Sequence, residues 1–203
     1  IPKTKYTIPN SVHQFFTFFQ RNFLSKFYNR QYVALSLFIS PVLATILALL
    51  SKSGTDMDTG LYSFAFNKNI PAFLFMTVIV ALFVGLVISA EEIYRDKKII
   101  KREQFLNLNS FSYLISKLTF LVILSAIQSF LFVIIGNSIL GIHDMIFSYW
   151  IVLFSVSCFA NILGLLISLL FNSVVVIYIL VPLLIVPQIL LCGVVVEYDD
   201  LNN

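Results

Sequence analysis

Charged residues are scarce in this chain of 203 amino acids, and their scarcity excludes most soluble folds. Only 11% of the residues are charged and 59% are hydrophobic, whereas a soluble domain carries about 25% charged residues. In lipid, a helix satisfies its own backbone hydrogen bonds, which an open sheet cannot do. The composition therefore predicts an all-α fold, a polytopic bundle of transmembrane helices.

Sequence patterns of catalysis and metal binding are also missing. The chain contains no GxxxxGK[ST] phosphate-binding loop and no HExxH, CxxC or GxSxG pattern. The two cysteines, Cys158 and Cys192, lie in apolar stretches and are predicted to be packing residues. His13 and His143 are expected on opposite sides of the membrane, so they cannot act together. We find no catalytic, cofactor-binding, metal-binding or nucleic-acid-binding residues, and whether the chain belongs to an enzyme stays open.

Long apolar segments are what the chain does have. A span of about 20 residues crosses the hydrocarbon core of a bilayer. We expect five spans within a transmembrane domain of residues 32–203, at about 32–50, 71–90, 113–140, 146–171 and 174–196. Pro182 and Pro187 are expected to break the fifth span, and Lys117 is expected to extend from the third span towards the lipid headgroups.

The residues before the first span divide into two parts. Residues 1–10 are polar, contain two prolines and are expected to be a linker from an upstream region of a longer polypeptide. Residues 11–31 have phenylalanines at helical spacing on one face and basic residues largely opposite. This pattern predicts an amphipathic helix at the membrane interface. The alternative is a helix that packs on a soluble domain.

The segment 91–112 carries nine charged residues between two apolar spans. Each charge costs about 3 kcal/mol at the centre of a bilayer, so the segment is predicted to be an aqueous loop. We expect a helix to continue past Arg95 and a short amphipathic helix to resume near residues 99–108. Its apolar ridge would fit a groove on a cytoplasmic partner, and the residues of that ridge are Ile99, Ile100, Phe105 and Leu108. Charge alone also fits a solvated loop that binds anionic lipid.

The distribution of basic residues predicts the orientation. If the N-terminus is cytoplasmic, the segments 1–31 and 91–117 hold eleven of the 13 basic residues, and only Lys52 and Lys68 lie outside. The positive-inside rule therefore places the N-terminus and the 91–112 loop in the cytoplasm.

Polar residues within the expected spans are neutral, apart from Lys117 near the start of the third span. Two interpretations stay open for Gln128 and Asn161. Their side chains either form hydrogen bonds between helices or line a substrate pathway. A broken fifth span could also line a pathway, which adds Pro182, Pro187 and Gln188 as candidates. The near absence of ionised residues at mid-depth argues against an ion-coupled carrier.

Several short motifs, taken in order, resemble the membrane domain of type-2 ABC transporters, and in particular the G-subfamily-like bacterial branch. The motifs are Gln14-Phe15, Gln20-Arg21-Asn22, Glu92-Ile93-Tyr94-Arg95-Asp96, Lys101-Arg102-Glu103, Tyr113-Leu114-Ile115-Ser116-Lys117, Ala126-Ile127-Gln128 and the stretch 181–193. Two features depart from the family pattern. Asp96 stands where glutamate is commoner, and five spans are present of an expected six.

The resemblance implies the permease of an exporter that is driven by ATP hydrolysis. It implies that residues 11–31 form the connecting helix and that the 91–112 loop is a coupling helix contacting a nucleotide-binding domain. The residues carried over to that contact are Glu92, Arg95, Lys101, Arg102 and Glu103.

The resemblance also implies the partners and the location of the chain. The nucleotide-binding domain, expected upstream in the same polypeptide, would hold ATP and Mg, and a second membrane domain would complete a homodimer or heterodimer. The location would be the bacterial inner (plasma) membrane. The alternative is a polytopic membrane scaffold or assembly protein that transports nothing.

Overall fold

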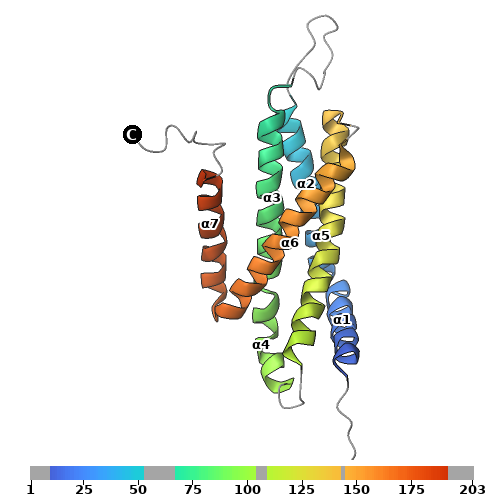
Figure 1. Cartoon of the computed structure of the whole chain (residues 1–203), viewed down its shortest axis with the longest axis vertical. Helices are drawn as coiled ribbons and strands as arrows, with labels where there is room; N and C mark the ends of the chain where they lie inside the picture. Colours follow the sequence, from blue (N-terminus) through green and yellow to red (C-terminus); the bar gives the residue numbers. More distant parts are fainter. Residues whose placement is uncertain (1–9, 53–66, 104–108, 143–144, 192–203) are drawn as a thin grey trace, which may run out of the picture.

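The computed structural model describes residues 10–52, 67–103, 109–142 and 145–191, and they form a bundle of helices (Figure 1). The helices are α1 Ser11–Phe27, α2 Arg30–Ser51, α3 Ile70–Ala90, α4 Glu92–Glu103, α5 Ser110–Leu140, α6 Ile146–Leu170 and α7 Val174–Leu191. No strand occurs in these ranges. The predicted all-α bundle is therefore confirmed.

Four of the described helices, α2, α3, α5 and α6, are long and apolar enough to cross a membrane, and α7 is a shorter apolar helix. Polar caps account for where two of them begin. The Asn29 side chain accepts a hydrogen bond from the Tyr32 amide at 3.2 Å at the start of α2, and Asn109 does the same for Phe111 at 3.0 Å in α5. Gly141 ends α5 in the left-handed conformation, with φ 68°.

The centre of the bundle is a close contact between α3 and α6, which cross in Figure 1. We call this contact the α3–α6 seam and define it by Gly85 and Ser89 on α3 and by Ala160 and Gly164 on α6. A Cβ atom added to Gly85 would lie 2.8 Å from the Ala160 Cβ, and one added to Gly164 would lie 3.0 Å from the Leu86 carbonyl oxygen. Small residues therefore allow the two backbones to approach.

Two local expectations from the sequence are wrong. α7 runs without interruption through Pro182 and Pro187, so the prolines do not break it. A proline removes one backbone donor, and the bonds of neighbouring residues hold the helix together. The charged segment is also one helix, α4, from Glu92 to Glu103, with no pause after Arg95. Its glutamate, lysine and arginine residues favour helix throughout.

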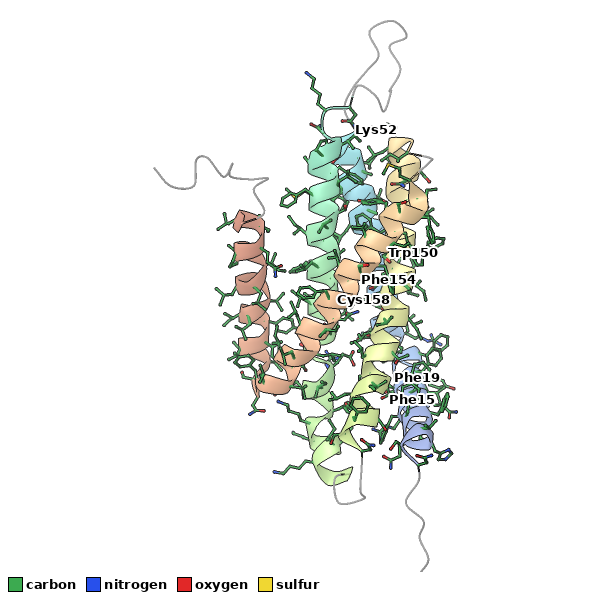
Figure 2. The ribbon with its side chains drawn as sticks, viewed as in Figure 1. Phe15, Phe19, Lys52, Trp150, Phe154 and Cys158 are labelled. Carbon is green, nitrogen blue, oxygen red and sulfur yellow. The ribbon has the colours of Figure 1, made fainter. Side chains whose placement is uncertain are left out.

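The described ends of the bundle differ in character. α1 and α4 lie together at one end, which we call the charged end, and Lys52 lies at the other (Figures 1 and 2). Stacked aromatic rings follow one face of α1, with Phe15 and Phe19 centroids 6.1 Å apart. Several residues of interest fall outside the described residues, and they are Phe105, Leu108, His143 and Cys192.

Candidate functional site

A single residue, Glu91, separates the helix α4 from α3. One face of α4 is buried in the bundle and the other is exposed. Ile93 is buried against Leu121 and Leu165, and Ile100 packs against the same cluster. Arg95, Lys98 and Lys101 are exposed. The alternation follows helical periodicity, since residues seven apart share a face. Ile100 therefore packs within the bundle, and Ile99 is the exposed part of the predicted ridge among the described residues.

The first turn of α4 is capped by a residue 75 positions away in the sequence. The Ser168 hydroxyl, near the end of α6, accepts hydrogen bonds from the backbone amides of Ile93 at 3.0 Å and Tyr94 at 2.9 Å. Ser168 is fully buried. Amides at a helix start have no partner within their helix, so Ser168 supplies the acceptor that a local capping residue would otherwise provide.

A lysine of α4 makes the reciprocal contact with the end of α6. Lys97 Nζ donates to the Phe171 carbonyl at 2.8 Å, to the Leu169 carbonyl at 3.2 Å and to the Asn172 side chain at 2.8 Å. A cation is favourable at a helix C-terminus, where carbonyl groups lack partners. We call the contacts of Ser168 and Lys97 together the α4–α6 clamp. Each helix caps the other, so displacing α4 must also displace the end of α6.

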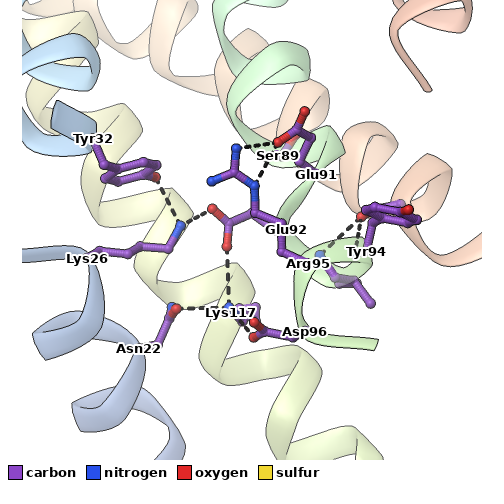
Figure 3. Close-up of polar contacts among 12 residues, drawn as sticks. Asn22, Lys26, Tyr32, Ser89, Glu91, Glu92, Tyr94, Arg95, Asp96 and Lys117 are labelled. Atoms are coloured by element: carbon purple, nitrogen blue, oxygen red, sulfur yellow. Dashed lines mark hydrogen bonds and ion pairs between the residues drawn. The ribbon is translucent and has the colours of Figure 1, made fainter. Parts of the chain in front are cut away.

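Glu92 joins α4 to two further helices through buried charges (Figure 3). One carboxylate oxygen pairs with Lys26 of α1, and the other lies 3.3 Å from Lys117 Nζ of α5. The Glu92 and Lys117 side chains are only 7% and 5% exposed. Lys117 therefore points into the protein rather than towards the headgroups, which corrects the expectation from the sequence.

The remaining contacts of this charged cluster complete the hydrogen bonding of Lys117. Its ammonium lies 2.8 Å from Asp96 and donates to the Asn22 side chain at 2.9 Å, while Tyr113 donates to Asp96 at 2.8 Å. Burial lowers the pKa of Lys26, and the Lys117 ammonium lowers it further, whereas the Asp96 carboxylate raises it. We define the charged cluster as Lys26, Glu92, Asp96 and Lys117.

The structure divides the residues that the resemblance assigned to coupling. Glu92 is buried in the charged cluster, whereas the Arg95 side chain is 66% exposed and pairs with Glu91 one turn earlier, at 2.5 Å. Lys101 is exposed. Arg102 and Glu103 form the last turn of α4, and their side chains lie outside the described residues.

The residues predicted for a substrate pathway are not brought together. Asn161 is buried and donates to the Ser125 hydroxyl at 2.7 Å, and Gln128 is buried and donates to the Ser36 carbonyl. These contacts join α6 to α5 and α5 to α2, which favours the interpretation as hydrogen bonds between helices. Pro182, Pro187 and Gln188 lie exposed on α7, which packs on α3.

Sequence reasoning missed the partners that hold α4 in place. Ser168 was one of several polar residues in an apolar helix, and nothing in its neighbours marks it as a cap. Lys26 appeared as part of the basic face of α1. A usable signal was the spacing of Glu92 and Asp96, because residues four apart share a helix face and two carboxylates there need cations. No cluster of potential metal ligands occurs among the described residues.

In the comparison with known proteins, a family model matches most of the chain. The family model described as ABC-2 type transporter matches residues 13–203. No curated protein and no solved structure matches. The assignment to the G-subfamily-like bacterial branch stays a prediction. The chain belongs to the ABC-2 type transporter family, as an integral membrane component of a kind that works with nucleotide-binding partners.

Proposed function

We propose that the chain is the permease domain of an ABC exporter and that α4 is its coupling helix. The observation that carries the proposal is the division of α4 into two faces. One face is tied to α1, α5 and α6 by the charged cluster and the α4–α6 clamp. The other presents Arg95, Lys98 and Lys101 at the charged end of the bundle, where a nucleotide-binding domain could dock.

The contacts supply a mechanical route from such a partner into the membrane. A displacement of α4 would pull on α6 through Ser168 and Lys97. The α3–α6 seam is too tightly packed to slide easily, so α3 and α6 would move as one body. ATP-dependent closure of the partner would then shift the bundle between two states. In this mechanism Glu92 acts inside the domain, and Arg95, Lys101, Arg102 and Glu103 act at the contact.

Membership of the family supports the proposal for the remaining parts of the transporter. ATP and Mg are proposed to bind the nucleotide-binding partner, expected upstream in the same polypeptide. The basic residues of α1 and α4 favour a cytoplasmic location for the charged end, and the proposed location is a bacterial plasma membrane. We place the substrate pathway between this domain and a second membrane domain, next to the exposed face of α7 with Pro182, Pro187 and Gln188.

The test is ATP hydrolysis by the full-length polypeptide, or its complex with a co-purifying ATPase, in lipid nanodiscs. We expect Arg102→Ala and Glu103→Ala to lower the turnover rate by about tenfold. A tenfold change corresponds to about 1.4 kcal/mol, and close charge pairs across an interface couple by about 1.5 kcal/mol or more. Lys52→Ala is the control, since Lys52 lies at the opposite end (Figure 2), and it should leave turnover unchanged.

Two results would contradict the proposal. If neither substitution in α4 changes turnover, α4 does not couple the two domains. If the intact protein neither hydrolyses ATP nor co-purifies with an ATPase, the transporter function itself fails, and a membrane scaffold becomes the better account.

A further inference from the structure

Two cavities meet beside the charged cluster, and they differ in chemistry. A polar cavity of about 260 Å³ lies among α1, α2, α4 and α5, and its lining includes Arg21, Asn22 and Lys117. An apolar cavity of about 270 Å³ lies among α1, α2 and α5, and its lining includes Phe23, Phe120 and Ile123. Lys26 and Tyr32 line both cavities. The two spaces therefore adjoin at these two side chains.

The polar cavity has an excess of positive charge. Four basic and two acidic side chains line it, with Glu92 and Asp96 as the acids. Arg95 pairs with Glu91. Arg21 lies at the cavity wall, where its guanidinium stacks 5.3 Å from the ring centroid of Phe18. An anion in this space would meet cations that the carboxylates of the cavity only partly neutralise.

One buried donor at the wall of the polar cavity lacks an acceptor among the described residues. Asn22 is only 7% exposed, and its side-chain oxygen accepts from Lys117. Among the described residues, no acceptor pairs with its Nδ2 amide. A buried donor without a partner costs free energy. The amide therefore marks a place where a ligand oxygen would be favourable.

The boundary between the cavities is amphipathic. The Lys26 ammonium donates to the Tyr32 hydroxyl at 3.0 Å and lies 4.8 Å from the ring centroid of Phe120. The ammonium group of Lys26 thus faces the polar cavity and lies close to the Phe120 ring, which lines the apolar cavity. A ligand that spans both spaces must have an anionic head joined to an apolar chain.

We propose that these adjoining cavities bind one anionic phospholipid, with its phosphate in the polar cavity and an acyl chain in the apolar cavity. The phosphate would accept from Arg21, from Lys26 and from the Asn22 amide. The apolar cavity opens among residues of α2 and α5, two helices with the length and hydropathy of membrane spans. A lipid can therefore enter sideways from the bilayer, and basic pockets between such helices bind anionic headgroups. Because the lipid would hold α1 against α4, it would also stabilise the charged end.

The experiment is a thermal-unfolding titration of the purified full-length protein in neutral detergent. The probe is dioleoyl phosphatidylglycerol, and the comparators are dioleoyl phosphatidylcholine, which has the same tails without net charge, and inorganic phosphate, which has charge without tails. We expect saturable stabilisation by phosphatidylglycerol at least about tenfold tighter than by either comparator. The titration needs no nucleotide, so its outcome is separate from that of the ATPase experiment.

Substitutions locate the site within the protein. Asn22→Asp keeps the oxygen that accepts from Lys117 but replaces the amide donor with a negative charge, so it should weaken phosphatidylglycerol binding by at least about tenfold while preserving lipid-free stability. Arg21→Gln, at an exposed position, should weaken binding without affecting folding. In the apolar cavity, Ile123→Gln should weaken binding, whereas Ile162→Gln on α6 is the control at similar exposure, 47% against 54%.

Three outcomes would overturn the inference. Equal stabilisation by phosphatidylcholine would show general solvation by lipid, and full stabilisation by phosphate alone would show an anion site that needs no lipid. Unchanged affinity in both Asn22→Asp and Arg21→Gln would place the lipid elsewhere on the protein.

Discussion

The α3–α6 seam and the charged cluster both hold helices together, and they do so by opposite means. At the seam, Gly85 and Gly164 leave no room for a Cβ atom, and the backbones fit against small side chains. In the charged cluster, long side chains from α1, α4 and α5 meet through ionised groups. One contact depends on shape and the other on charge.

This difference matches the surroundings of the two contacts. Within lipid, apolar helices gain little from burying apolar surface, so a stable contact needs close packing. At the charged end, groups that face water during folding can be ionised and then paired as the helices dock. The ion pairs of the charged cluster can rearrange when another charge approaches, whereas the close packing at the α3–α6 seam does not depend on charge. We expect the seam to keep its geometry during transport and the charged end to change.

The largest expected effect is that of Glu92→Gln. The substitution removes the negative charge between Lys26 and Lys117, and breaking a buried ion pair costs about 3–5 kcal/mol. Since Lys117 keeps Asp96 at 2.8 Å, we expect the lower end, about 3 kcal/mol, measured by chemical unfolding in detergent.

Glu91→Gln is the matched control for this experiment. Glu91 pairs with Arg95 four residues later, and the Arg95 side chain is 66% exposed whereas that of Glu91 is 13% exposed. Because one partner of this pair stays in water, the cost should be smaller, about 1 kcal/mol. If the two substitutions cost the same, burial of both partners does not distinguish the charged cluster from the Glu91–Arg95 pair.

A smaller loss is expected when the seam is overpacked. In Gly164→Ala, the new Cβ would meet the Ser89 side chain and would lie 3.0 Å from the Leu86 carbonyl oxygen. We expect a loss of about 2 kcal/mol, typical of overpacked interiors. Gly136→Ala is the control, because its Cβ would meet only the Phe73 ring edge, at 3.2 Å among described atoms, which requires a smaller shift than the contacts at Gly164.

A second substitution shows whether shape is the cause. Ser89→Ala removes the hydroxyl that the Gly164→Ala methyl group would meet, so the double variant should recover part of the stability. Additive losses in the double variant would instead indicate that the two residues act independently and that the seam is less tightly fitted than the distances indicate.

The smallest expected effect concerns the α4–α6 clamp. Ser168→Ala removes the acceptor of two amides at the start of α4, and losing a helix cap costs about 1 kcal/mol. Ser155→Ala in the same helix is the control, because its exposed hydroxyl bonds only to Ile151 of its own helix among the contacts described. Hydrogen exchange should show faster exchange of the Ile93 and Tyr94 amides in Ser168→Ala alone.

Hydropathy was a good guide to the helices because a span must be long and apolar wherever its neighbours lie. α2, α3, α5 and α6 appear where apolar segments were expected. Proline was a poor guide, since α7 continues through Pro182 and Pro187. The rule that proline ends a helix is a rule about local hydrogen bonds, and a helix can lose one of these bonds without ending.

The candidate site was predictable only in part. The segment that contains Glu92 and Arg95 stood out by its charge, and its family motif pointed to coupling. The sequence could not separate the buried Glu92 from the exposed Arg95, although they are three residues apart and both ionisable. The separation depends on which face of α4 meets α1 and α5, and that depends on how whole helices dock.

The sequence by itself determined that this protein lies in a membrane, which segments are apolar enough to cross it and where basic charge gathers. Those properties depend on composition along the chain, because the cost of moving a residue into lipid depends mainly on that residue. Only the tertiary structure decided that Ser168 caps α4, that Lys26 and Lys117 share Glu92 and that the Asn22 amide has no acceptor among the described residues. The contacts of Ser168, Lys26 and Lys117 join residues 25 to 75 positions apart, and side chains that distant meet only when the helices between them have packed.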